Sequence, residues 1–305
     1  MTLALTLAAA PALAQEAIPD RLRTLTRGSA WTQVSVLTLQ FPTHHPQGMA
    51  RIGDRTYLSS VEIIERTQRF DAPRDGLDRT PGRGAGHVYE IDAEGRLLRT
   101  LTLGEGDIYH PGGVDFDGTH LWVPVAEYRP NSRSIIYRVD PATLRAEEVF
   151  RFADHIGGLV MDRASNTLHG VSWGSRRFYA WPLGTDGKPT NAGVSPEALR
   201  RPNPSHYIDY QDCHSVGAGL ALCSGLNAYR PSGPSGPSFA LGGVELVDLA
   251  RGAPVFQLPV ELWTERGLPM TQNPFAVAAQ GNGLRFWFAP EDDSTRIFTY
   301  DVTRR

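Results

Sequence analysis

Three histidines of this 305-residue chain recur at one position of a repeated pattern. His45, His110 and His155 each stand four residues before an apolar residue that opens a short strand-like run, and Asp212 and Asn273 hold the same position in two weaker copies. Imidazole nitrogens and carboxylate oxygens together suit a divalent transition metal such as Zn, Mn or Fe better than Ca. If the copies surround one axis, His45, His110, His155 and Asp212 form a metal site. The alternative is that these side chains only cap strand ends.

Polar residues beside these positions are expected to support the ligands. Hydrogen bonds from neighbouring side chains fix the tautomer and orientation of a metal-bound imidazole, a role we assign to His214, Gln47 and Asn273. His44 precedes His45 directly. Because adjacent strand residues point to opposite faces, we expect only His45, which is in register with the other two histidines, to face the axis.

A second set lies where the second strand of each copy should end: Glu62, Glu127, Trp173, Asn227 and Glu291. A carboxylate near a bound cation can deprotonate water, so Glu127 and Glu62 are the predicted proton carriers and the others are predicted substrate contacts. The alternative for any one Glu is a solvated loop residue.

Two loops share the tripeptide Tyr-Arg-Pro, which contains Arg129 and Arg230. Arginine suits bidentate capture of carboxylate or phosphate, so these two residues predict a small anionic substrate. Acidic neighbours of the loop arginines, such as Glu65 and Asp78, favour the alternative that the charges pair with each other and are solvated.

The repeat predicts the elements that must position these residues. Five copies follow one another at spacings of roughly 45 to 65 residues, and each contains four short runs of β-branched and aromatic residues. This pattern is typical of an all-β, five-bladed β-propeller. A six-bladed ring is the alternative if residues 184–201 hide further strands. The longest insertions, residues 64–86 and 229–242, should lie on one face.

The fifth copy lacks its fourth strand, and residues 34–41, which alternate apolar and polar side chains, precede the first copy without a partner. We therefore expect this N-terminal strand to complete the fifth blade and close the ring. Residues 1–14 resemble the remnant of a signal peptide, residues 15–32 a polar tether, and residues 33–305 a single propeller domain.

Charge and cysteine content indicate which binding partners and which cellular compartment suit the chain. A net charge of -3 gives no electrostatic basis for nucleic-acid binding, and no segment is long enough to span a membrane. Cys213 and Cys223 flank a Gly-rich turn and could form a disulfide, with two buried thiols as the alternative. A disulfide fits a periplasmic or secreted protein, and we expect a monomer.

The opening His-x-Gly-Gly-apolar-x-x-Asp, at residues 110–117 and 155–162, resembles that of secreted propellers of the gluconolactonase-like and streptogramin-lyase-like group. The chain resembles most closely an uncharacterised bacterial family known only as a domain of unknown function. The resemblance implies a cation on the axis, bound by Glu, Asn and Asp in the first group and by His and Glu with magnesium in the second. Three axial histidines depart from the first pattern and favour a softer cation.

These observations predict an exported, metal-dependent hydrolase or lyase for a small anionic or sugar-derived molecule at the top of the channel. The alternative is a propeller that binds a ligand or a protein without catalysis.

Overall fold

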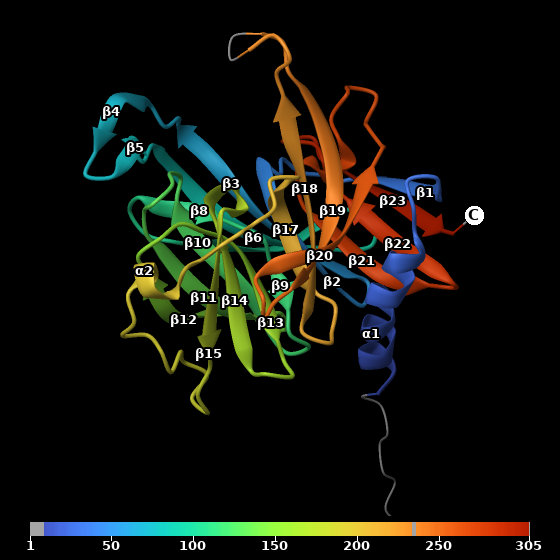
Figure 1. Ribbon diagram of the computed structural model, residues 1–305, viewed down its shortest axis with the longest axis horizontal. Coiled ribbons are helices and arrows are strands. Elements are labelled where there is room, and N and C mark those ends of the chain that lie inside the picture. Colours follow the sequence, from blue (N-terminus) through green and yellow to red (C-terminus); the bar gives the residue numbers. More distant parts are fainter. Residues whose placement is uncertain (1–8, 234–235, 305) are drawn as a thin grey trace, which may run out of the picture.

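Five β-sheets surround a common axis (Figure 1). The computed structural model describes residues 9–233 and 236–304 and confirms the predicted all-β, five-bladed propeller. The six-bladed alternative is wrong, because residues 184–201 contain only the short helix α2 (Pro196–Leu199) and the first residue of a blade-three strand.

The blades follow the chain order. Blade one contains β2 (His45–Ile52), β3 (Arg55–Glu65), β6 (Arg83–Ile91) and β7 (Leu97–Leu103). Blade two contains a divided inner strand, β8 (Ile108–Pro111) and β9 (Asp115–Phe116), then β10 (Leu121–Glu127), β11 (Ser134–Asp140) and β12 (Arg145–Phe152). Blade three contains β13 (Ile156–Asp162), β14 (Thr167–Ser172), β15 (Arg177–Pro182) and β16 (Arg201–Pro202).

Blade four contains β17 (Asp209–Ser215), β18 (Leu220–Tyr229), β19 (Phe239–Asp248) and β20 (Ala253–Val260). Blade five contains β21 (Phe275–Gln280), β22 (Gly283–Phe288), β23 (Arg296–Thr303) and β1 (Ala30–Thr38). The 3₁₀ turns η1 (Trp173–Ser175) and η2 (Met270–Gln272) interrupt loops. The fourth strand of blade five is thus N-terminal, as predicted, although it begins and ends a few residues earlier than expected.

The two long insertions lie on one face, as the repeat predicted. In blade one the insertion forms a hairpin of β4 (Arg69–Arg74) and β5 (Leu77–Arg79), and in blade four β18 and β19 extend beyond their sheet. Figure 1 shows both projecting from the upper side of the ring.

Apolar side chains fill every interface between neighbouring blades. Strands such as β3 and β10 carry runs of consecutive buried residues. Each sheet therefore packs side chains of both faces against the two neighbouring blades. The clusters contain Val88 and Val123 between blades one and two, Ile136 and Leu159 between two and three, Val160 and Val247 between three and four, Leu246 and Phe286 between four and five, and Ile297 and Leu58 between five and one. The last cluster joins the two ends of the array.

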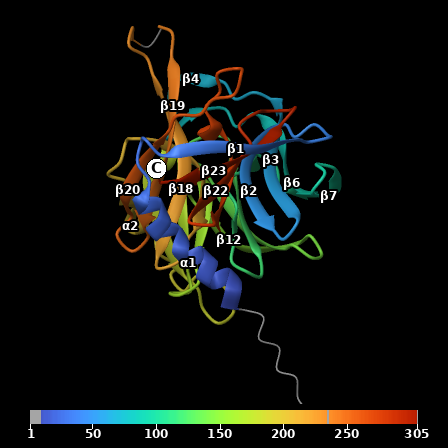
Figure 2. The same ribbon diagram turned by 90° about the vertical axis from the view of Figure 1, so that its right-hand side faces the viewer.

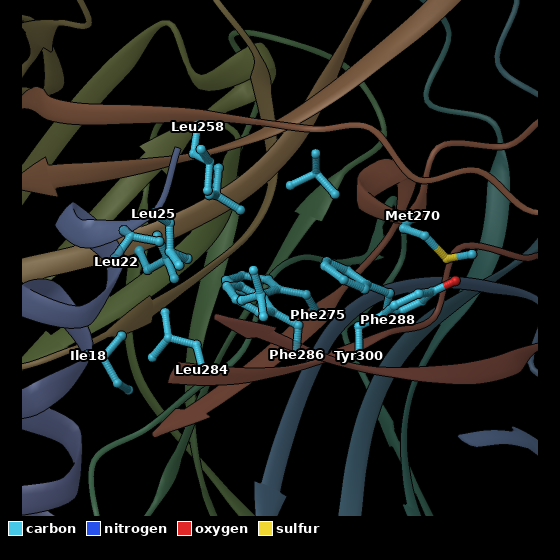
Figure 3. Packing of buried hydrophobic residues seen from close by; sticks show 14 of the residues in the cluster. Ile18, Leu22, Leu25, Leu258, Met270, Phe275, Leu284, Phe286, Phe288 and Tyr300 are labelled. Atoms are coloured by element: carbon cyan, nitrogen blue, oxygen red, sulfur yellow. The ribbon is translucent and has the colours of Figure 1, made fainter. Parts of the chain in front are cut away.

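The segment predicted as a polar tether is instead a helix, α1 (Ala9–Thr24), that crosses one side of the ring (Figure 2). Ile18, Leu22 and Leu25 fall on one face of the chain at spacings of four and three residues and are buried in the core of blades four and five (Figure 3). The Arg21 guanidinium also donates to the carbonyl of Gly283 over 3.0 Å. Residues 1–8 of the predicted signal peptide lie outside the described residues. No helix in residues 9–233 and 236–304 is long and apolar enough to span a membrane.

Cys213 and Cys223 form the predicted disulfide, which joins directly opposite residues of β17 and β18. We expect the double Cys→Ala variant to lose about 2–3 kcal/mol of unfolding free energy, because the bridge closes a loop of about ten residues in the unfolded chain. Denaturant titration with and without reductant measures this. The variant should not respond to reductant, and equal stability of oxidised and reduced wild-type protein would contradict the prediction.

Candidate active site at the mouth of the channel

The bulges of the inner strands decide which residues share a level of the channel. Inner strands of blades one, three and four have the same register shift, between Pro46 and Gly48, Ile156 and Gly158, and Tyr210 and Asp212. The residues directly before these shifts, His45, His155 and Asp209, are therefore equivalent. In blade two, Gly113 pairs with Gly158, which puts His110 at the level of His155. Asp212 was predicted to lie at the level of the histidines. In blade four that position is occupied by Asp209 instead.

Asp212 lies deeper in the channel and binds backbone amides. Its carboxylate accepts N–H bonds from Met49 at 2.9 Å and Val114 at 3.1 Å, so blade four is tied to blades one and two. Asp115 accepts in the same way from Met161 at 2.9 Å and Ser215 at 3.3 Å. We call Asp115 and Asp212 the axial carboxylates. Both are buried and serve the fold.

His214 lies between the axial carboxylates, with Nε2 at 3.5 Å from Asp212 and Nδ1 at 3.7 Å from Asp115. Its Nε2–H also donates to the carbonyl of Phe275 at 2.7 Å. Burial would lower the pKa of this imidazole, but the two carboxylates outweigh burial and raise the pKa to about 10. His214 was predicted to support a metal ligand; it is instead a buried cation of the channel wall.

His110 lies at the level of His155, and its polar atoms make no hydrogen bonds within the protein. Its side chain is 5% exposed, and neither ring nitrogen has a hydrogen-bond partner. The ring stacks on Tyr128 at a centroid distance of 4.2 Å and lies 5.9 Å from the ring of His155. Burial, with the neighbouring His155 and His45, holds the pKa of His110 well below its usual value, so the ring is neutral. Buried polar atoms without partners are costly to leave in a fold and indicate a ligand position.

His155 presents one ring nitrogen with a defined lone pair. Its Nδ1–H donates to the backbone carbonyl of Glu127 at 2.8 Å, which leaves Nε2 unprotonated. The edge of this ring meets Trp173 at 4.8 Å. Burial lowers the pKa of His155 to about 4, so this imidazole too is neutral near pH 7.

His45 is held by a carboxylate. Its Nδ1–H donates to Asp292 Oδ1 at 2.8 Å, and Asn273 Nδ2 donates to the same oxygen at 2.9 Å. Burial would raise the pKa of Asp292, but these two hydrogen bonds keep it below its usual value. Asp292 is thus ionised and fixes the tautomer that leaves His45 Nε2 as a proton acceptor. The buried Oδ1 of Asn273 has no partner. We call His45, His110, Tyr128, His155, Trp173, Asn273 and Asp292 the mouth.

Cationic side chains border the mouth. The Arg79 guanidinium lies 5.0 Å from the ring centroid of Trp173. Arg66 is exposed and, within the described part of the chain, makes no ion pair. Arg79 is already paired with the Asp78 carboxylate at 2.8 Å. Burial raises the pKa of the Tyr128 hydroxyl, the charges of Arg79 and Arg66 oppose that rise, and the charge of Asp292 adds to it.

The histidines of the mouth do not make a preformed metal site. Among the described residues, one set of three ligand-type side chains has its ligand atoms all within 4.8 Å of one another, and it is His44, Glu62 and His87. Glu62, a predicted proton carrier, therefore lies with His44, which the sequence suggested only as a neighbour of the metal ligands, and with His87, which the sequence did not assign to a site. His45, His110 and His155 share a level, but their ring nitrogens are spaced more widely.

The other predicted site residues support the fold or lie apart. The Glu127 carboxylate, predicted to carry protons, binds Arg133 at 2.6 Å and Arg129 at 2.5 Å, so neither Glu127 nor Arg129 is free for a substrate. Glu291 binds Arg296 at 2.5 Å in the same manner. The remaining predicted residues are Gln47, which donates to the carbonyl of Pro46, Asn227, which donates to that of His206, and Arg230, at the start of the blade-four loop.

Comparison with known proteins agrees with this architecture. The model of a family of unknown function, DUF6454, matches residues 2–305. The chain belongs to this family. The sequence matches no curated protein.

Solved structures share the fold at low identity. A mannose phosphorylase from Leishmania mexicana, in complex with phosphate ion, is 10% identical, with 89% of each chain covered and a TM-score of 0.53. A GH43 endo-arabinanase from Bacillus licheniformis is 8% identical, with 87% of this chain and 95% of that chain covered and a TM-score of 0.47. At 10% identity the likeness to the phosphorylase shows the fold alone.

The side chains that sequence reasoning missed follow the ones it selected. Tyr128 and Asp292 come directly after Glu127 and Glu291, at the bends that follow the second strands of blades two and five. Glu127 and Glu291 bind arginines, whereas Tyr128 stacks on His110 and Asp292 binds His45. The repeated tripeptide Tyr-Arg-Pro, which begins with Tyr128, was the available sequence signal.

A cavity of about 660 Å³ lies at the other end of the channel, lined by Met49, Arg51, Arg163 and Ile18 of α1 among others. Its wall includes Asp115 and His214, whose charges are already satisfied by each other and by the backbone. The mouth, with its unpartnered His110, is therefore the better candidate site.

Proposed function

We propose that the protein is a hydrolase or lyase that acts on a small anionic or sugar-derived molecule at the mouth. The observation that carries the proposal is His110, a buried neutral imidazole whose two ring nitrogens have no partner. A substrate oxygen or a reacting water that accepts or donates a hydrogen bond there would satisfy it.

His45 is the general base. Its Nδ1–H is held by the ionised Asp292, so Nε2 accepts a proton from water in a hydrolysis or from a carbon beside a carboxylate in an elimination. The protonated ring then returns that proton to the leaving group. Asp292 stabilises the imidazolium that forms between the two steps.

The neutral His110 and His155 orient the reacting groups. Neither carries a positive charge near pH 7. His155 accepts a hydrogen bond at Nε2 from a substrate hydroxyl or a water, whereas His110 can donate through one ring nitrogen and accept through the other. Tyr128 and Trp173 supply apolar walls, and Arg66, which is exposed and makes no ion pair among the described residues, attracts an anionic substrate. We further propose that the protein works in the periplasm or outside the cell, where its disulfide is stable.

A substrate screen with matched variants tests the proposal. Wild-type protein is offered lactones, esters and uronic acids, beside His45→Gln, His110→Gln and, as a control, His120→Gln in the β9–β10 turn. We expect His45→Gln to reduce kcat at least about 100-fold, since a positioned base contributes about 10² to 10⁴. His120→Gln should keep full activity.

Two outcomes would overturn this assignment. Wild-type turnover in His45→Gln and His110→Gln would place the reaction elsewhere. Binding of these compounds, detected as a thermal shift that His110→Gln abolishes, without any turnover, would establish the non-catalytic binding propeller instead.

A further inference from the structure

A cluster of two histidines and a glutamate lies beside the mouth, on blade one. His87 Nε2 is 3.4 Å from Glu62 Oε2, and His44 Nε2 is 4.0 Å from the same oxygen. The imidazole rings of His44 and His87 lie nearly parallel at 5.8 Å. The side chains of His44, Glu62 and His87 are 29%, 41% and 13% exposed, so the cluster is open to solvent on one side.

Sheet register accounts for two members of the cluster. His87 of β6 lies opposite Ser60 of β3, and Glu62 follows Ser60 by two residues on the same face of β3. Diagonal neighbours on one face are within reach of long side chains. Tyr89 stacks on His87 at 5.4 Å from the other side and fixes its ring.

The third member of the cluster, His44, has an unusual backbone conformation. His44 has φ of 57°, the left-handed region that few residues other than glycine adopt. Its carbonyl accepts from Asp293 N at 2.6 Å, and Thr43 N donates to the carbonyl of Asp293 at 3.0 Å. This geometry turns the His44 side chain toward Glu62 while the next residue, His45, turns to Asp292. Non-glycine residues held in this region concentrate at functional sites.

The two separations at Glu62 fit a divalent cation, and the ligand atoms of all three side chains lie within 4.8 Å of one another. Ligand atoms at roughly 2.1 Å from one ion can be at most roughly 4.2 Å apart, and the two separations at Glu62, 3.4 and 4.0 Å, lie within this limit. Two imidazoles and one carboxylate, with an open side for water, are ligands of zinc and of related divalent transition metals. Magnesium and calcium prefer oxygen ligands.

We propose that His44, Glu62 and His87 bind a zinc-class divalent metal ion with an open coordination position. The site is separate from the mouth, and the inference does not depend on the proposed reaction. Since His44 and His45 are consecutive, ion binding also fixes the segment that carries His45.

Metal titration of the full chain without a histidine tag tests the proposal. Isothermal titration with Zn²⁺, after chelation and dialysis, is expected to show one equivalent bound in wild-type protein. His87→Gln, Glu62→Gln and His44→Asn should each weaken binding at least about 100-fold, because even a residue behind a ligand contributes about 10- to 100-fold. Asparagine at position 44 tolerates the left-handed backbone, so that variant removes the imidazole without straining the loop.

Controls separate this site from the mouth. His110→Gln and His120→Gln should bind Zn²⁺ as wild-type does, and all metal-free variants should show the wild-type unfolding curve. Substitution of Co²⁺ should give visible absorption bands that His87→Gln lacks. Absence of stoichiometric binding of Zn²⁺, Co²⁺, Mn²⁺ or Fe²⁺, full retention in His87→Gln and Glu62→Gln, or loss only in His110→Gln would overturn the proposal.

Discussion

The free energy of unfolding is expected to fall by about 3–5 kcal/mol, through His214 alone, as the pH rises from about 6.5 to about 10. The axial carboxylates raise the pKa of this imidazole to about 10 in the folded protein, against about 6.5 in an unfolded chain. A raised folded-state pKa means that the folded protein binds the proton more tightly. The stabilisation is therefore complete below about pH 6.5 and lost as the pH passes about 10.

Comparison with His214→Gln isolates this contribution from other titrating groups. At neutral pH the variant leaves two carboxylates facing each other in the channel wall without a cation, so it should be markedly less stable than wild-type protein. Denaturant titrations across this pH range should show the two stabilities converging toward pH 10. Parallel curves would mean that His214 is neutral in the fold.

Replacement of Glu127 by Gln is expected to cost about 3 kcal/mol of unfolding free energy. The carboxylate is 1% exposed and neutralises both Arg129 and Arg133. Removal of one partner from a buried ion pair costs about 3–5 kcal/mol because the other charge stays buried. We place the effect at the lower end, since the Arg133 side chain is 65% exposed and can be hydrated.

An exposed ion pair supplies the matched control. Glu147 binds Arg138 at 2.6 Å with 54% of its side chain exposed, and Glu147→Gln should change stability by less than about 1 kcal/mol. Chemical denaturation of both variants measures the difference. If Glu127→Gln were no more destabilising than Glu147→Gln, the Glu127 carboxylate would not be structural, and its predicted role as a proton carrier would regain support.

The fold was predictable because one pattern of strands and turns repeats along the sequence. Five copies of one strand pattern predict five blades, and a missing fourth strand in the last copy predicts that residues near the N-terminus supply it. The helix α1 was missed for a different reason. Ile18, Leu22 and Leu25 do show helical spacing, but the run is short and directly follows an apolar leader-like segment.

The site was only partly predictable, because bulges and strand ends decide which side chains converge. His45, His110, His155, Trp173 and Asn273 do gather at the mouth. The bulge between Tyr210 and Asp212 moves Asp212 out of that level, and a bulge leaves no mark in a single sequence. His87 lies in a third strand, where nothing in the repeat suggested a ligand, and only the register of β3 with β6 puts it beside Glu62.

The pairing of β1 with β23 also constrains when the protein can fold. Ala30 pairs with Thr303, so the first strand of the sheet is synthesised long before its partner. Contacts between residues so distant in sequence form slowly, because the whole intervening chain must be ordered first. Blade five and its packing against blade one cannot be completed on a partly made chain. The ring of blades is therefore closed only after the C-terminal strand has been synthesised.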